Sequence, residues 1–226
     1  MLNVVECAAA AVAPIKNGST VMIGGFGVAG QPVELIDALI EEGATDLTVV
    51  NNNAGNGDVG LAKLISLGRV RKIICSFPRQ ADSHHFDAKY HAGEIELEAV
   101  PQGNLAERIR AAGAGIGAFF TPTGYGTPLA EGKEVRELGG KMQILELPIT
   151  ADFSLTKAVT ADTAGNLVYR KTARNFGPIM AAAATHSIVQ VSNVVQRGQL
   201  DPEVVVTPGI YVDTVVAIDS PAVGQA

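Results

Sequence analysis

Short apolar runs alternate along the chain with longer stretches whose apolar residues recur every three or four positions. The short runs predict strands and the amphipathic stretches predict helices. The second helix has the clearest end signals, with Pro32 at its start and Gly43 at its end. The predicted strands are 20–23, 46–50, 72–76, 95–100 and 116–120. The predicted helices are 3–13, 32–42, 61–67, 82–91 and 105–112.

This order of elements predicts an α/β fold, with a mostly parallel sheet flanked by helices on both faces. Beyond residue 130 the pattern changes, and Gly139-Gly140-Lys141 between two apolar runs predicts a β-hairpin over 135–147. The later predicted elements are two paired strands over 153–159 and 167–170, a helix over 178–184 and a strand over 187–191. No linker or repeat interrupts the chain, so we expect one domain over residues 1–226, with a disordered tail at 220–226.

The composition indicates the size of the domain and excludes some classes of binding partner. The chain has 226 residues, 47% of them hydrophobic, which is enough to bury the core of one ordinary domain. Its net charge of −6 provides no overall positive field, which argues against nucleic acid or an anionic membrane as a partner. Glu6 interrupts an N-terminal apolar run that no Lys or Arg precedes, so we expect no export and a cytoplasmic location. Cys7 and Cys75 form no recognisable framework, and we expect both to be buried.

Ligands of a parallel sheet lie beyond the carboxyl ends of its strands, so the loops at those ends carry the candidate chemistry. The first such loop is Gly24-Gly25-Phe26-Gly27-Val28-Ala29-Gly30, between a predicted strand and a predicted helix. Backbone N–H groups at such a turn suit a phosphate, and the glycines also fit the G-x-G-x-x-G pattern of dinucleotide-binding proteins. That pattern needs an acidic residue where the second strand ends, and Asn51-Asn52-Asn53 stands there instead. Three interpretations result: an acyl-CoA site, a NAD site and a purely structural turn.

Amide side chains stand at two further strand ends. Asn52 and Asn53 suit a left-handed turn, or present amide dipoles to a carboxylate or thioester oxygen. Gln102 lies between a predicted strand and a predicted helix. It serves there either as a helix cap or as a hydrogen-bond donor to an oxyanion. The residues by themselves do not decide between turn and ligand contact for the two asparagines, or between cap and oxyanion donor for Gln102.

Two other clusters have simpler explanations. The histidines 84, 85 and 91 lie near two aspartates without the spacing of any established metal site, so we expect a solvated helix face and no metal. The basic run Tyr169-Arg170-Lys171, with Arg174, is typical of a salt-bridged surface, although such a cluster also suits a phosphate.

Several of these segments together resemble family I CoA-transferases. The resemblance is to the A (α) subunit of the members that act on 3-oxoacids, and it runs from about residue 15 to residue 215. It implies the fold of that family, which is NagB/RpiA-like, with CoA or acyl-CoA as a substrate and no permanently bound cofactor. The segments that carry it are 17–26 with Gly30-Gln31-Pro32, 100–110, 121–127 and Ala173-Arg174-Asn175-Phe176.

The resemblance also implies roles for individual residues. The Gly24–Gly30 loop matches the CoA-binding segment of the family, Gln102 matches its oxyanion-hole glutamine, and Asn52 and Asn53 match asparagines of its acyl site. The nucleophilic glutamate of the family lies in a Ser-Glu-Asn-Gly segment of the B subunit, and this sequence contains no such segment. We therefore expect the partner to be a B subunit, in a heterodimer or in a heterotetramer with two copies of each chain.

Two segments, 53–57 and 76–80, most resemble the family members that act on 3-oxoadipate. The implied reaction moves CoA from succinyl-CoA to 3-oxoadipate through a glutamyl-CoA thioester on the partner, in the degradation of aromatic compounds. Arg79 is then a candidate for binding the second carboxylate of the substrate, because arginine meets a carboxylate with a planar fork. The alternative is that Arg79 makes a salt bridge at the subunit interface. The alternatives are acetoacetate or acetate as the acceptor, a NAD-dependent enzyme and a non-catalytic ligand-sensing module.

Overall fold

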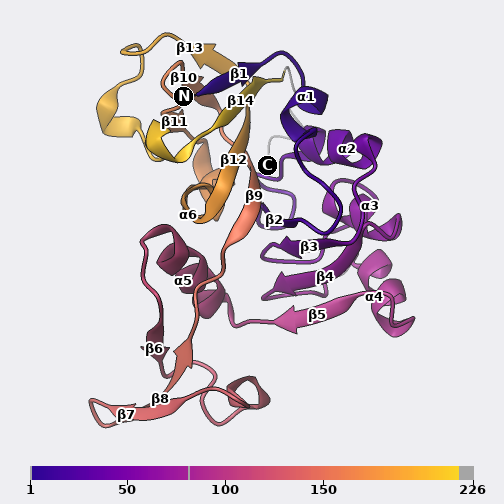
Figure 1. The fold of residues 1–226 in the computed structure, drawn as a ribbon, viewed down its shortest axis with the longest axis vertical. Helices are drawn as coiled ribbons and strands as arrows, with labels where there is room; N and C mark the ends of the chain where they lie inside the picture. The colour runs from indigo at the N-terminus through magenta and orange to yellow at the C-terminus, as the bar shows by residue number, and fades with distance from the viewer. Residues whose placement is uncertain (1, 81, 219–226) are drawn as a thin grey trace.

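The computed structural model describes residues 2–80 and 82–218, so the predicted disordered tail at 220–226 lies outside the described residues. The main element is an eight-stranded sheet in the order β1-β14-β12-β9-β2-β3-β4-β5, and every neighbouring pair in it is parallel. The predicted parallel sheet is thus confirmed (Figure 1). Its strands are β1 (Asn3–Val5), β2 (Thr20–Ile23), β3 (Leu47–Val50), β4 (Val70–Cys75), β5 (Glu96–Ala99), β9 (Ala151–Lys157), β12 (Ala184–Val191) and β14 (Thr214–Ala217).

Helices cover both faces of this sheet, as predicted. Val21 and Ile23 of β2 pack into the apolar cluster under α1 to α4, whereas Met22 packs into the cluster under α5 and α6. Successive side chains of a strand point to opposite faces, so β2 contributes to both cores. None of the helices in the described ranges is long and apolar enough to cross a membrane. The helices are α1 (Ala8–Val12), α2 (Val33–Glu42), α3 (Leu61–Ser66), α4 (His84–His91), α5 (Gln102–Gly113) and α6 (Gly177–Ala183).

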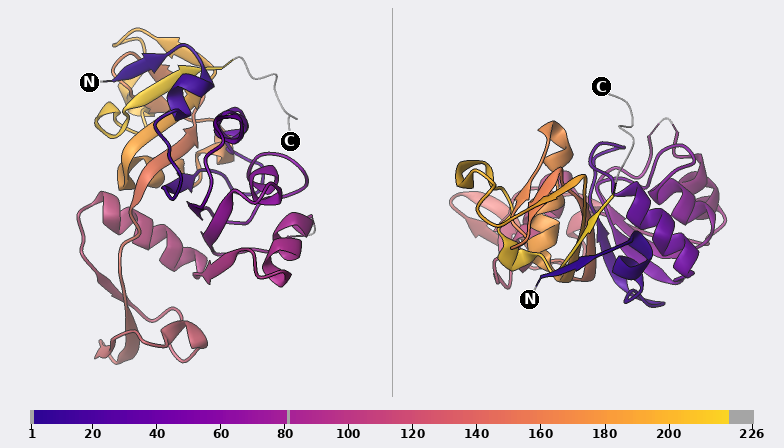
Figure 2. Two further views of the ribbon diagram at one scale, coloured as in Figure 1. Left: turned by 45° about the vertical axis from the view of Figure 1, so that its right-hand side comes forward. Right: turned by 90° about the horizontal axis from the view of Figure 1, so that it is seen from above.

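Two small sheets extend the fold. One is antiparallel in the order β6-β8-β7, and it projects away from the main sheet (Figures 1 and 2). Its β7–β8 pair confirms the predicted hairpin. The other has the order β11-β10-β13. The elements concerned are β6 (Phe119–Thr121), η1 (Pro128–Ala130), β7 (Val135–Leu138), β8 (Lys141–Glu146), β10 (Thr160–Asp162), β11 (Leu167–Val168), η2 (Lys171–Arg174), β13 (Asn193–Val195), η3 (Pro202–Val204) and η4 (Gly209–Tyr211).

The N-terminal prediction is wrong in part. The expected helix over 3–13 is a strand, β1, followed by the short helix α1. Val4 and Val5 pair in parallel with β14, more than 200 residues further along the chain. Their β-branched side chains suit that strand position, and only tertiary pairing reveals it. Cys7, expected to be buried, is exposed just before α1, while Cys75 is buried as expected.

Two later strand pairings are also wrong. The run predicted over 116–120 forms β6, which pairs with β8 in the projecting sheet and not with the parallel sheet. The loop after it, 122–127, therefore does not follow a strand of the parallel sheet. The run predicted over 153–159 forms β9, which lies between β2 and β12 in the main sheet, whereas β11 pairs with β10. All of these runs are apolar enough for either position, so local pattern cannot select their partners.

The strand order reverses beside β2. From β2 the chain adds β3, β4 and β5 on one side, and it later places β9 and β12 on the other. Open α/β sheets bind ligands in the crevice at such a reversal, outside the carboxyl ends of the strands. The glycine loop follows β2, so the fold puts it at this crevice.

Candidate active site

A pocket of about 320 Å³ lies at the carboxyl ends of β3 and β4. Its walls come from the loops after β2, β3 and β4 and from the first residue of α5. Another hollow, of about 420 Å³, lies before β2 and β3, at the opposite end of the strands, and holds none of the candidate residues. The pocket is lined by Phe26, Asn52, Ser76, Phe77, Gln80 and Gln102. The fold thus brings together three predicted site residues from separate segments: Phe26, Asn52 and Gln102.

An amide network holds the centre of this pocket. The Oδ1 atom of Asn52 accepts hydrogen bonds from Ser76 Oγ at 2.7 Å and from Gln102 Nε2 at 2.9 Å. Two donors on one oxygen fix the orientation of the buried Asn52 amide. Gln102 Nε2 carries a second proton, which has no partner among the described residues. That proton is available to a carbonyl oxygen in the pocket.

Gln102 is the first residue of α5, and its side chain caps nothing. Pro101 occupies the N-cap position, and no side chain makes a cap hydrogen bond there. The prediction of a helix beginning near residue 105 is therefore three residues late, because the first turn of α5 lines the pocket. The amino end of a helix carries partial positive charge, so this position favours negative charge in the pocket beside Gln102.

The neighbouring asparagines have different surroundings from Asn52. Asn51 Nδ2 donates to the carbonyl oxygen of Ile23 at 2.5 Å, and Asn51 Oδ1 accepts from the N–H of Asn53 at 2.8 Å. Asn53 Oδ1 accepts from the N–H of Gly55 at 3.0 Å, and Asn53 is fully buried. Its Nδ2 atom has no partner among the described residues. Asn53 shapes the loop after β3, whereas Asn52 faces the pocket.

The glycine loop forms a tight turn. Phe26 and Ala29 exchange backbone hydrogen bonds of 3.0 and 3.2 Å, which leaves Gly27 and Val28 at the tip. Val28 is 67% exposed there. Gly30 has a φ of +76°, and a Cβ atom at this position would lie 2.3 Å from the carbonyl oxygen of Ala173. Glycine is therefore required at residue 30 by backbone conformation and by close approach.

Asn175 holds this loop in place. Its Oδ1 accepts from the N–H of Gly25 at 3.2 Å, and its Nδ2 donates to the carbonyl oxygen of Ala29 at 2.9 Å. Sequence reasoning did not identify Asn175 as a site residue, although the segment 173–176 was part of the family resemblance. The same reasoning did not select Ser76 or Gln80. Neither spacing nor periodicity links residues that are so far apart along the chain.

The cations near the site fall into two groups. Arg79 does not line the pocket, and its Nε atom forms a 2.6 Å ion pair with Asp87 on α4. Arg170, Lys171 and Arg174 are exposed, and they make no ion pair with any residue that the structure describes. They lie on η2 or next to it, immediately before Asn175. These three exposed side chains thus lie on the segment that leads into Asn175, the residue that binds the glycine loop.

Two further groups of titratable residues play no part in the pocket's amide network. His85 and His84 contact Asp58 Oδ1 at 2.7 and 3.2 Å, and their hydrogen bonds lower the pKa of Asp58 below its ordinary value. These side chains could hold a metal ion, so the absence of a metal stays a prediction. Burial raises the pKa of Cys75 to about 12, which keeps this thiol protonated and unreactive.

Comparison with known proteins identifies the family. The model of the Coenzyme A transferase family matches residues 5–217 of this chain. A match over nearly the whole chain, on a fold with its pocket at the strand carboxyl ends, shows that the chain belongs to the coenzyme A transferase family.

Individual relatives agree with this assignment. The chain is 64% identical to the A subunit of the 3-oxoadipate CoA-transferase of Pseudomonas putida, over 96% of this chain and 94% of that protein. It is 49% identical to the A subunit of the succinyl-CoA:3-ketoacid coenzyme A transferase of Xanthomonas campestris pv. campestris, over 96% and 88% of the two chains.

Solved structures share the fold at low identity. The glutaconate coenzyme A-transferase of Acidaminococcus fermentans superposes with a TM-score of 0.85 at 20% identity, over 95% of this chain and 75% of that chain. An acyl-CoA transferase of Escherichia coli O157:H7 gives a TM-score of 0.85 at 23% identity, over 96% of this chain. The match covers 47% of the E. coli chain, so this chain spans about half of its length.

Proposed function

We propose that this chain is the A subunit of a cytoplasmic 3-oxoadipate CoA-transferase, which acts together with a B subunit. The observation that carries the proposal is the identity of 64% and 65% to the A subunits of two 3-oxoadipate CoA-transferases, each over more than nine tenths of the chain. Relatives named as A subunits of succinyl-CoA:3-ketoacid coenzyme A transferases are less similar, with identities such as 49% and 43%. The pocket supports the proposal because it offers amide donors and contains no nucleophilic carboxylate among its lining residues in the described ranges.

The proposed reaction begins when the partner's glutamate attacks the thioester carbonyl of succinyl-CoA. The oxygen of that carbonyl gains negative charge in the tetrahedral intermediate, which collapses to a mixed anhydride and CoA thiolate. The thiolate then attacks the glutamyl carbonyl, releases succinate and leaves a glutamyl-CoA thioester. The same steps in reverse transfer CoA to 3-oxoadipate. A carboxylate is a weak nucleophile, so the reaction depends on activation of each carbonyl.

Gln102 supplies that activation in the proposed mechanism. One Nε2 proton of Gln102 is donated to Asn52 Oδ1, which also accepts a hydrogen bond from Ser76. These two bonds fix the direction in which the second Nε2 proton points. A donor held in place before the reaction stabilises an oxyanion without further reorganisation. The role of Asn52 is to orient Gln102 and to offer its own amide to the acyl group.

The phosphates of CoA fit the surroundings of the glycine loop. Arg170, Lys171 and Arg174, which make no ion pair with residues in the described ranges, come shortly before Asn175, which holds this loop. Charge-assisted hydrogen bonds from such side chains are the usual means of binding phosphate. This supports an acyl-CoA, and not a structural turn alone, as the interpretation of the loop.

The proposal predicts that the chain is inactive by itself. Purified alone, it should form no 3-oxoadipyl-CoA from succinyl-CoA and 3-oxoadipate, because no Ser-Glu-Asn-Gly nucleophile is present. Addition of the B subunit from the same organism should restore turnover. Rates on 3-oxoadipate, acetoacetate and acetate, followed by thioester absorbance, identify the acceptor. Turnover by the lone chain, or a preference for acetoacetate, would contradict the proposal.

We propose in addition that Arg79 selects the dicarboxylic substrate. Arg79 follows β4 near the pocket residues 76, 77 and 80, and its guanidinium is half exposed in its pair with Asp87. An exposed pair contributes at most about 1 kcal/mol, so a substrate carboxylate can compete for the arginine. Arg79→Met should lower kcat/KM for 3-oxoadipate about tenfold or more, the effect of a charged hydrogen bond of about 1.5–3 kcal/mol.

The matched control for Arg79→Met is Asp87→Asn, which removes the competing partner and retains the arginine. This variant should keep or raise the activity on 3-oxoadipate. Activity of Arg79→Met on acetoacetate should hold, because acetoacetate lacks a second carboxylate. Equal losses on both acids would assign Arg79 a structural role.

A further inference from the structure

The sheet β6-β8-β7 and its connections, residues 113–148, form a projecting arm. No residue of 113–143 is buried in the structure, and the four residues of β7 are all exposed. Alternate residues of a strand face opposite sides, so neither face of β7 is covered by this chain. β7 is also an edge strand, which leaves a row of backbone groups without partners.

The arm buries little apolar surface of its own: Ile144 on β8 is the one large hydrophobic side chain of its described residues that is buried. The three apolar clusters of the described residues include nothing from 113–148. Three strands need an apolar face packed against something to be stable in water. Seven of the seventeen large hydrophobic side chains that are exposed in the described residues nevertheless lie on the arm. They are Ile116, Tyr125, Leu129, Val135, Leu138, Met142 and Leu147.

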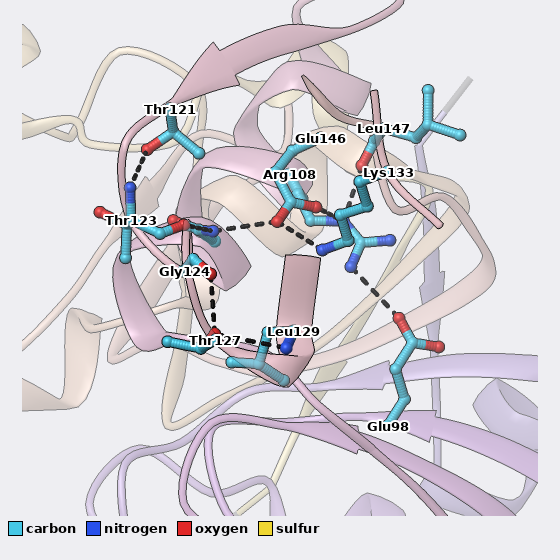
Figure 3. Close-up of polar contacts among 11 residues, drawn as sticks. Glu98, Arg108, Thr121, Thr123, Gly124, Thr127, Leu129, Lys133, Glu146 and Leu147 are labelled. Atoms are coloured by element: carbon cyan, nitrogen blue, oxygen red, sulfur yellow. Dashed lines mark hydrogen bonds and ion pairs between the residues drawn. The ribbon is translucent and has the colours of Figure 1, made fainter. Parts of the chain in front are cut away.

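Several hydrogen bonds and ion pairs hold the root of the arm, as Figure 3 shows. Glu146 is buried, and its Oε1 accepts from Asn104 Nδ2 at 3.0 Å and from Lys133 Nζ at 2.7 Å. Arg108 donates to the carbonyl oxygen of Leu147 at 2.7 Å and pairs with Glu98 at 3.2 Å. Asn104 also donates to the carbonyl oxygen of Thr123 at 3.1 Å. A fixed root with an uncovered apolar end is typical of an element that binds a partner.

The charges of the arm identify the kind of partner. Lys133 pairs with Glu146 and Arg136 pairs with Glu134, so much of the charge is neutralised within the arm. Such a surface has no strong positive electrostatic potential that would attract a nucleic acid or an anionic membrane. Its exposed apolar side chains are instead suited to contact with the apolar face of another protein. Every residue of 113–143 is at least partly exposed, so the arm is large enough to provide the roughly 20–30 residues on one side of a standard protein interface.

We propose that the arm is a docking surface for the B subunit. The proposal rests on the proposed function for the identity of this partner. Asn104, which binds the arm, lies two residues after Gln102 in the first turn of α5. Phe26 and Phe77, which are 48% and 56% exposed, line the pocket together with Gln102. A partner that brings its glutamate to Gln102 therefore covers the arm in the same contact.

The test is association of the full-length chain with the B subunit, measured by sedimentation and calorimetry without substrate. Val135→Glu and Leu138→Glu should each raise the dissociation constant about tenfold or more, since a charge replaces an apolar contact. Leu138→Met should bind normally. The control is Ile210→Glu on η4, at a side chain that is 84% exposed and outside the arm. It should leave association unchanged.

The outcomes separate this inference from the proposed function. Normal association of both charged variants, confirmed as folded by circular dichroism, would overturn the docking surface even if the wild-type pair transfers CoA to 3-oxoadipate. The lone chain could also self-associate, and Leu138→Glu could abolish that self-association. This result would assign the arm to contact with a second copy of the chain and would overturn the proposed docking surface for the B subunit. A wild-type pair that forms through the arm but does not use 3-oxoadipate would contradict only the proposed function.

Discussion

Replacement of Gln102 by alanine is expected to lower kcat by about 10²–10³, the usual effect of removing one oxyanion donor. KM should change little, because the hydrogen bond strengthens mainly in the transition state. Stability should hardly change, since Gln102 is exposed and makes no cap hydrogen bond. The measurements are steady-state kinetics of the reconstituted pair and urea unfolding of the chain.

The matched control is Gln80→Ala, the same substitution at another residue that lines the pocket. The side-chain oxygen of Gln80 accepts a hydrogen bond from Asn56, so this side chain supports the loop and is not oriented toward Asn52. Its loss should lower kcat by less than about tenfold. A Gln102→Ala enzyme of normal kcat and reduced stability would assign Gln102 a structural role.

The second large effect is expected from Gly30→Ala, which should lower the free energy of unfolding by about 2–4 kcal/mol. An alanine at φ +76° is strained, and its Cβ would lie 2.3 Å from the backbone oxygen of Ala173. The segment around Ala173 would have to move, and with it Asn175, which binds Gly25 and Ala29. Affinity for CoA, measured by calorimetry with the reconstituted pair, should fall in parallel because the loop loses its support.

Gly27→Ala is the control for this prediction. Gly27 also has a positive φ, +61°, but no atom lies within 4 Å of the added Cβ position. Only the backbone strain applies, so the loss of stability should be about 1–2 kcal/mol. Equal unfolding free energies for the two variants would show that the contact with Ala173 does not require glycine at residue 30.

The sequence by itself determined the fold class and the type of most elements, and it selected three residues that the structure places at one pocket. The strand at 20–23, the helix between Pro32 and Gly43 and the hairpin around Gly139-Gly140 each follow from local spacing and turn chemistry. Because parallel strands end at one edge of a sheet, the same reasoning predicted that the loops after β2 and β3 lie close to Gln102, and all three contribute to one pocket. The family resemblance added the roles that spacing left open.

Tertiary structure alone decided which apolar runs pair and which polar groups meet. The runs at 116–120 and 153–159 are similar in pattern, yet one lies in the arm and the other in the centre of the sheet. Asn175 reaches the glycine loop from 150 residues away, and Ser76 orients Asn52 from the next strand end. Periodicity reports only which face of an element is apolar. The partner of that face depends on packing between distant segments, and no local pattern records it.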